Sequence, residues 1–386
     1  MRYRWPLLAN AALTAAVLVA SCQDHERPAR GGGPLVPAPD AGGDGFDPGT
    51  PDGPPPLDAP GLCGNELHEI SYEAPNVYFV LDRSGSMAEP DPAAKKSRYA
   101  VVREAALDLV RSLGTLINVG AAVFPRFPDS NPCHVGGEVF PTSPGDPNGA
   151  EDGPTTQGFA QATDLEPNGG TPIAATLTET TPIWLELPGR TVVLLLTDGV
   201  PNCNEQQSCG IEECIPNIEK AQGCDAQTNC CAPDGPGGPE NCVDRYPTLA
   251  AIHTLRDNNI EVYVIGIPGS AFYADLLDEM AVAAGTAKEQ SPKYYRVDDL
   301  ALLGAVFASI AAQAISCEFP LADPPAEKGM TNVYLDGVLL PFDPVGGWSW
   351  KGDDTVWLHG EACQKLKTGG VALVQVVSGC PTEVPK

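Results

Sequence analysis

The chain of 386 residues carries 23 Lys and Arg against 50 Asp and Glu, a net charge of −27 at neutral pH. This balance argues against nucleic acid as a partner, because phosphate binding needs a basic face. A hydrophobic fraction of 42% is enough for a buried core and excludes global disorder, and the length predicts two or three domains.

The chain begins with a predicted lipoprotein signal peptide, residues 1–22. Two arginines in the first four residues precede an apolar run that is too short to favour a retained transmembrane anchor. The run ends in Val-Ala-Ser-Cys, which resembles a bacterial lipobox, so we expect Cys22 to be lipidated; a soluble secretory signal is the alternative. Thirteen cysteines are typical of an oxidising compartment, and lipidation of Cys22 leaves an even number that can pair.

Residues 23–62 are predicted to be a disordered tether. This segment contains ten prolines and nine glycines, with aspartates spaced among them. Its few apolar residues cannot offset the entropy cost of ordering the chain, and its like charges keep it extended. We therefore expect it to hold a folded domain away from a membrane surface.

Residues 63–317 alternate strand-like and helix-like segments, which predicts an α/β fold with a doubly wound, mostly parallel sheet. Continuous apolar runs indicate strands buried on both faces, and apolar residues three or four positions apart indicate amphipathic helices. The expected strands are 77–81, 117–124, 192–196, 260–267 and 294–297, and the expected helices are 95–113, 171–184, 246–258, 272–284 and 300–314. Pro172 is expected at the first helical position of its helix, and residues 125–170 are expected to be a long loop.

Polar residues follow two of the predicted strands. Asp82, Ser84 and Ser86 follow the first, Asp198 follows the strand at 192–196, and Thr171 opens a helix. A strand order of 3-2-1-4-5-6 would place these two strands side by side, and ligands of such sheets bind at the carboxyl ends of the strands. Hydroxyl and carboxylate oxygens suit Mg²⁺ or Mn²⁺. The alternative is that these side chains only cap turns.

This constellation resembles the von Willebrand factor type A (VWA) domain and its metal-ion-dependent adhesion site. The resemblance covers about residues 74–316 and implies a Rossmann-like fold with a doubly wound, mostly parallel six-stranded sheet. It implies that Ser84, Ser86 and Thr171 coordinate the metal and that Asp82 and Asp198 complete its shell. It also implies a protein partner that offers an acidic side chain to the ion.

Seven cysteines lie in a predicted insert, residues 203–242. They include no Cys-x-x-Cys pair and no neighbouring histidine, so disulfides are favoured over zinc. The odd number requires a partner outside the insert, and Cys133 is expected to be that partner. Loop and insert would then rim the metal site, either shaping partner selectivity or only bracing the loops. We further expect Cys63 to pair with Cys317 and Cys363 with Cys380.

Residues 318–386 predict a small β module. Asp336-Gly337 between two strand-like runs is a strong hairpin signal. Further strand-like runs lie at 348–350, 355–358 and 371–377. The tryptophans Trp348, Trp350 and Trp357 could form a binding surface, but alternating aromatic residues in strands favour a core.

No hydrolase or phosphate-binding motif occurs, and the five histidines are scattered, so we expect no enzymatic activity. The resulting hypothesis is a lipid-anchored binding module of the bacterial cell envelope, in the outer membrane, that uses Mg²⁺ or Mn²⁺ for protein–protein binding or adhesion. A metal-independent envelope scaffold and a metal-dependent hydrolase are the alternatives.

Overall fold

The computed structural model describes residues 63–64, 66–147, 149, 151–371 and 373–385. The predicted signal peptide, the lipidation site at Cys22 and the predicted tether lie outside the described residues. Within the described part of the chain, no helix combines the length and the apolar character needed to cross a membrane.

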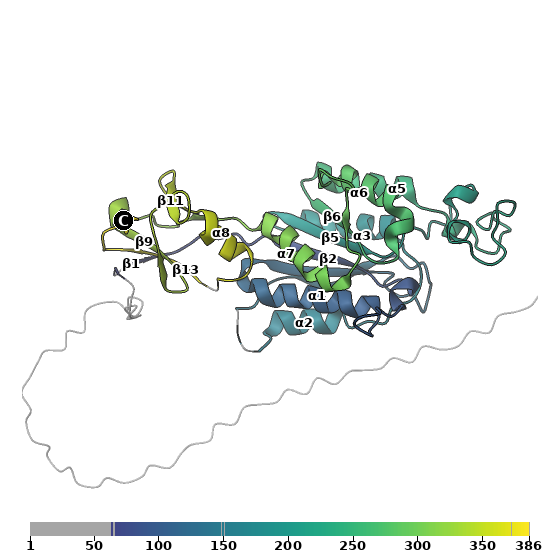
Figure 1. The fold of residues 1–386 in the computed structure, drawn as a ribbon, viewed down its shortest axis with the longest axis horizontal. Coiled ribbons are helices and arrows are strands. Elements are labelled where there is room, and N and C mark those ends of the chain that lie inside the picture. Colours follow the sequence, from purple (N-terminus) through teal and green to yellow (C-terminus); the bar gives the residue numbers. More distant parts are fainter. Residues whose placement is uncertain (1–62, 65, 148, 150, 372, 386) are drawn as a thin grey trace, which may run out of the picture. The chain divides into compact units, whose positions relative to one another are not determined.

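A six-stranded, mostly parallel sheet forms the centre of the larger α/β part (Figure 1). Its strands, in spatial order, are β4 (Gly137–Pro144), β3 (Asn118–Phe124), β2 (Asn76–Asp82), β5 (Thr191–Thr197), β6 (Glu261–Gly266) and β7 (Tyr295–Arg296). Numbered along this sheet alone, the order is the expected 3-2-1-4-5-6. Only β4 is antiparallel to its neighbour. Every residue of β2 and β5 is buried, as continuous apolar runs predict for central strands.

Two layers of helices cover the sheet, and alternate residues of β2 point into each layer. The helices are α1 (Arg98–Leu113), α2 (Pro154–Ala162) and α7 (Leu303–Ala314) on one face, and α3 (Ile173–Leu185), α5 (Arg245–Asp257) and α6 (Ala274–Ala284) on the other. Figure 1 shows α5 and α6 on the opposite side of the sheet from α1 and α2. Phe79 packs on Phe159 and Phe307 of the first layer, whereas Tyr78 packs on Trp184 of the second.

The segment 125–170 is not the long loop that we expected, because it contains β4 and α2. Both are at the edge of the fold and bury few side chains, so neither carries a full apolar pattern in the sequence. The expected place of Pro172 is also corrected: α3 begins at Ile173, and Pro172 directly precedes it. Helices α6 and α7 begin a few residues later than predicted because a short 3-10 turn precedes each of them.

The C-terminal segment and strand β1 together form two small antiparallel sheets. They are built from β1 (Glu66–His68), β8 (Glu318–Pro320), β9 (Thr331–Leu335), β10 (Val338–Leu340), β11 (Trp348–Lys351), β12 (Thr355–Leu358) and β13 (Val374–Ser378), with helix α8 (Gly360–Lys367). The predicted hairpin is present, and Asp336 and Gly337 both have positive φ, as a type I′ turn requires. Trp348 is fully buried, as expected for a core residue, while Trp357 is 41% exposed.

Six disulfides join the twelve cysteines of the described part of the chain. They are Cys63–Cys380, Cys133–Cys203, Cys209–Cys242, Cys214–Cys231, Cys224–Cys230 and Cys317–Cys363. The bond from Cys133 to the insert agrees with our expectation, but the Cys63–Cys317 and Cys363–Cys380 pairings are wrong. Strand β1 pairs with β13, which brings Cys63 beside Cys380 and leaves Cys317 to bond with Cys363. The insert also contains a short helix, α4 (Ile215–Ile218).

Candidate metal-binding site

The first carboxylate of the candidate site lies where β2 ends. Asp82 is the last residue of that strand and is fully buried, and β5 runs parallel beside it. Its Oδ2 accepts a hydrogen bond from the Thr197 hydroxyl at 2.6 Å, and its Oδ1 accepts one from the Ser84 backbone N–H at 2.8 Å. Both oxygens of Asp82 therefore have hydrogen-bond partners. These bonds fix the start of residues 84–88, which we call the serine loop.

Ser84 directly precedes a short 3-10 turn (Gly85–Ala88), and Ser86 lies on it. The Ser84 and Ser86 hydroxyl oxygens are 3.1 Å apart, and Ser86 donates a hydrogen bond to Asp198 Oδ1 at 2.6 Å. Met87, fully buried in the core, anchors this turn. The serine loop thus links the carboxylate at the end of β2 to the carboxylate that follows β5.

Thr171 reaches the same place from the loop that precedes α3. We call residues 169–172 the threonine loop. The Gly85 N–H donates a hydrogen bond to the Gly169 carbonyl at 2.8 Å, so this loop is joined directly to the serine loop. Thr171 is 7% exposed, and its hydrogen bonds among the described residues involve its backbone N–H and carbonyl, not its hydroxyl. Together with Ser84 and Ser86 it lines a hollow of about 410 Å³. The structure thus brings together all five residues that the sequence singled out.

Burial dominates the electrostatics of the two carboxylates. Desolvation, followed by repulsion from Asp198, raises the pKa of Asp82 to about 7. Burial also raises the pKa of Asp198, although hydrogen bonds from Ser86 and Arg98 oppose the shift. Arg98 Nη1 lies 2.8 Å from Asp198 Oδ2, and Arg98 Nη2 lies 2.7 Å from Glu89 Oε2. One guanidinium is thus shared between a buried and an exposed carboxylate.

The donor set suits a hard divalent cation. It offers hydroxyl and carboxylate oxygens only, and Mg²⁺ and Mn²⁺ prefer oxygen ligands. Thr171 lines the hollow. A nearby cation would favour the ionised form of the two carboxylates, whose pKa values burial raises. The residues present therefore fit such an ion.

Sequence reasoning missed three polar residues of this site. Thr197 was visible as part of Thr-Asp-Gly, and its position before Asp198 was a signal for its contact with Asp82. Arg98 begins α1 and Asn202 lies in the loop after β5; nothing in their sequence context points to the site. Asn202 accepts a hydrogen bond from the Thr171 N–H at 2.7 Å.

The loop before α3 and the cysteine-rich insert both form the wall of the hollow, as expected from the Cys133 pairing. Ile215, Glu219, Glu240 and Asn241 of the insert line it, and so does Cys133. Tyr273, which also lines the hollow, donates a hydrogen bond from its hydroxyl to Glu219 Oε1 at 2.8 Å. The insert thus contributes side chains to the wall of the hollow.

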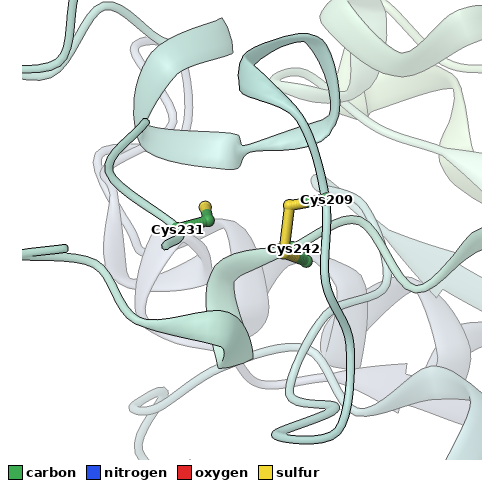
Figure 2. Close-up of side chains that lie close together, drawn as sticks. All are labelled: Cys209, Cys231 and Cys242. Atoms are coloured by element: carbon green, nitrogen blue, oxygen red, sulfur yellow. A yellow bond between two sulfur atoms is a disulfide. The ribbon is translucent and has the colours of Figure 1, made fainter. Parts of the chain in front are cut away.

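A second group of metal-ligand residue types, Cys209, Cys231 and Cys242, is not a metal site. Their sulfur atoms lie within 4.8 Å of one another (Figure 2). However, Cys209 is bonded to Cys242, and Cys231 is bonded to Cys214. Zinc binds to thiolates, and none of these three sulfurs is a free thiol. The group is a pair of neighbouring disulfides, as the sequence favoured.

No known family model matches the sequence, and no curated protein matches it significantly. Among solved structures, the chain is similar to the pilus adhesin SpaC from Lactobacillus rhamnosus GG in an open conformation. The TM-score is 0.46 at 16% identity, and the alignment covers 81% of this chain and 39% of SpaC.

Two further structures show comparable similarity. The vWF domain of the type V pili tip protein Mfa5 from Porphyromonas gingivalis has a TM-score of 0.41 at 14% identity, over 62% of this chain and 94% of that one. Proximal thread matrix protein 1 from the mussel byssus, with a zinc-occupied MIDAS motif, has a TM-score of 0.36 at 14% identity, over 61% and 44%. This chain spans less than half the length of SpaC and of the mussel protein. With TM-scores below 0.5, none of these similarities assigns a ligand or a function to it.

Proposed function

We propose that this chain is a cell-envelope lipoprotein whose VWA-like domain binds Mg²⁺ or Mn²⁺ and uses the ion for metal-dependent protein–protein binding or adhesion. Ser84, Ser86 and Thr171 would hold the ion, and Asp82 and Asp198 would orient the hydroxyls or bound waters. The observation that carries the proposal is the hydrogen-bonded path from Asp82 through the serine loop to Asp198, which lies beside Thr171.

The chemistry of the donor set favours binding over catalysis. A cation held largely by neutral hydroxyls keeps most of its charge and attracts a further anionic oxygen. An Asp or Glu side chain of a partner protein can supply that oxygen from the hollow. None of the described residues that line the hollow is a histidine, the side chain best suited to act as general base at neutral pH. We therefore expect no enzymatic activity.

The proposed place of the protein follows from the sequence. We propose that Cys22 carries the lipid, that the anchor lies in the bacterial outer membrane, and that residues 23–62 separate the membrane from the folded part. Metabolic labelling with a fatty acid tests the anchor, because Cys22→Ala should remove the label. Label retained in Cys22→Ala would contradict lipidation at this residue.

Thermal unfolding during a Mg²⁺ or Mn²⁺ titration tests the metal site on residues 23–386. A ligand that binds only the folded state stabilises it by RT ln(1 + [L]/Kd), which is about 1.4 kcal/mol when the metal concentration is ten times Kd. We expect the midpoint to rise in the wild type but not in Asp82→Ala or Ser84→Ala. Ser309→Ala removes an exposed serine hydroxyl from α7 and should behave like the wild type. No shift at millimolar metal in the wild type would contradict the proposal.

Capture of a binding partner with and without metal distinguishes metal-dependent binding from the alternative, a metal-independent scaffold. A partner captured in Mg²⁺ by affinity pull-down, without cross-linking, should dissociate on addition of EDTA and should not bind Asp82→Ala. Equal capture with Mg²⁺ and with EDTA would support the scaffold instead.

A further inference from the structure

Asn202 makes hydrogen bonds to both the N–H and the carbonyl of Thr171. The Thr171 N–H donates a hydrogen bond to Asn202 Oδ1 at 2.7 Å, and the Asn202 N–H donates one to the Thr171 carbonyl at 3.0 Å. Among the described residues, the hydrogen bonds of Thr171 involve its backbone and not its hydroxyl, so the position of the backbone determines where the side chain begins. The residue after Asn202 is Cys203.

The other half of the same disulfide holds the preceding residue. The Gly170 N–H donates a hydrogen bond to the Pro132 carbonyl at 2.8 Å, and Pro132 is bonded to Cys133 in the chain. The sulfurs themselves lie against Gly170. A Cβ built at Gly170 would lie 2.5 Å from Cys203 Sγ and 3.5 Å from Cys133 Sγ. The Cys133–Cys203 bond thus joins the two segments that make hydrogen bonds to residues 170 and 171. We call this disulfide the clamp.

The insert also has disulfides of its own. Three other disulfides, Cys209–Cys242, Cys214–Cys231 and Cys224–Cys230, connect cysteines within the insert. Cys203 also has a φ of +76°, a left-handed conformation that costs a residue other than glycine free energy. The position of Cys203 is thus maintained against a local preference, at the point where it contacts the threonine loop.

We propose that the Cys133–Cys203 disulfide and Asn202 are positioning groups for Thr171 and set both the affinity and the ion selectivity of the metal site. This inference rests on the proposed metal site. Mg²⁺ requires a near-ideal octahedron, whereas Ca²⁺ accepts six to eight oxygens in flexible arrangements. A displaced Thr171 therefore weakens Mg²⁺ binding more than Ca²⁺ binding.

The test compares four variants of the full lipidated chain in detergent with the wild type. The double variant Cys133→Ser/Cys203→Ser removes the clamp, and Cys224→Ser/Cys230→Ser is the matched control because it removes one disulfide elsewhere in the insert. Asn202→Ala removes the side-chain acceptor, while Asn202→Asp keeps it. Titration calorimetry measures the Kd values of Mg²⁺ and Ca²⁺, and unfolding in EDTA measures stability without metal.

We expect the clamp variant to raise the Kd of Mg²⁺ about tenfold and that of Ca²⁺ less, which changes the ratio of the two. Asn202→Ala should also raise the Kd of Mg²⁺ more than that of Ca²⁺, but by less than the clamp variant does. Asn202→Asp should bind Mg²⁺ with most of the wild-type affinity. The control should leave both Kd values unchanged, even where its stability in EDTA falls. A loss of stability alone cannot produce a change in the Mg²⁺ to Ca²⁺ ratio.

The outcomes separate the two proposals. If the wild type binds no divalent ion, the proposed metal site is wrong, and the proposed positioning role of the Cys133–Cys203 disulfide is wrong with it. If the wild type binds Mg²⁺ and the clamp variant and Asn202→Ala bind it equally well, the clamp alone is overturned. Should the clamp variant fail to fold, Asn202→Ala decides the question, since it keeps all six disulfides.

Discussion

Arg98 donates a hydrogen bond from Nη1 to Asp198 Oδ2 at 2.8 Å, so a permanent positive charge lies beside a carboxylate of the candidate metal site. The other carboxylate oxygen, Oδ1, accepts the Ser86 hydroxyl. The Arg98 side chain is 17% exposed, which limits solvent screening of its charge. Arg98 therefore stabilises the ionised form of Asp198 and at the same time repels a cation that enters the hollow.

Replacing this arginine should tighten metal binding. We expect Arg98→Gln to lower the Kd of Mg²⁺ about three- to tenfold, because removal of one positive charge several ångströms away relieves about 1 kcal/mol of repulsion. Calorimetric titration checks this, with Arg111→Gln as control, since Arg111 pairs with Asp152 on the protein surface. Weaker binding by Arg98→Gln would mean that orienting Asp198 outweighs the repulsion.

The raised pKa of Asp82 makes stability and metal binding respond oppositely to pH. Without metal, the folded state holds the Asp82 proton more tightly than the unfolded state. The resulting stability is fully present below about pH 4, the pKa of an unperturbed Asp, and is lost as the pH rises to about 7. Metal binding needs the ionised carboxylate, so the midpoint gain from Mg²⁺ should be larger at pH 8 than at pH 5.5.

Unfolding curves recorded across this pH range, with EDTA or with Mg²⁺, check both directions. Asp82→Asn resembles the protonated side chain, so in EDTA it should lose less stability than the wild type between pH 4 and 7. A Mg²⁺ effect that is equal at pH 5.5 and pH 8 would contradict the assignment of Asp82 to the site.

The close contact between Gly170 and the disulfide predicts a strong effect of one added methyl group. Gly170→Ala places a Cβ 2.5 Å from Cys203 Sγ, so the threonine loop must shift. We expect a loss of about 1–3 kcal/mol in the free energy of unfolding and weaker Mg²⁺ binding. Gly199 lines the same hollow, but a Cβ there meets no atom within 4 Å. Gly199→Ala should change stability by less than about 0.5 kcal/mol, and equal effects of the two substitutions would contradict the packing argument.

Phe79 tests the core independently of the site. Its ring is fully buried and packs edge-on against Phe159 and Phe307. Phe79→Ala should lower the free energy of unfolding by about 3–5 kcal/mol, measured by urea denaturation in EDTA. Phe272 is 74% exposed, so Phe272→Ala should cost far less. Similar losses in the two variants would show that the described core is not the one that stabilises the protein.

The sequence by itself determined the centre of the sheet and the five candidate site residues. Strands β2 and β5 are buried on both faces, which forces a continuous apolar run that is visible without any structure. Asp82 and Asp198 follow these runs directly. Their approach then depends only on two central parallel strands being neighbours.

Only the tertiary structure decided the remaining features, because they depend on contacts between distant segments. The edge elements β4 and α2 bury too few side chains to leave a pattern, and β1 finds its partner β13 at the other end of the chain. Cysteine spacing does not encode pairing, since a disulfide can form only between cysteines that folding brings together, with Cα atoms usually within about 7 Å. For the same reason the contact of Arg98 with Asp198, 100 residues apart, has no local signal.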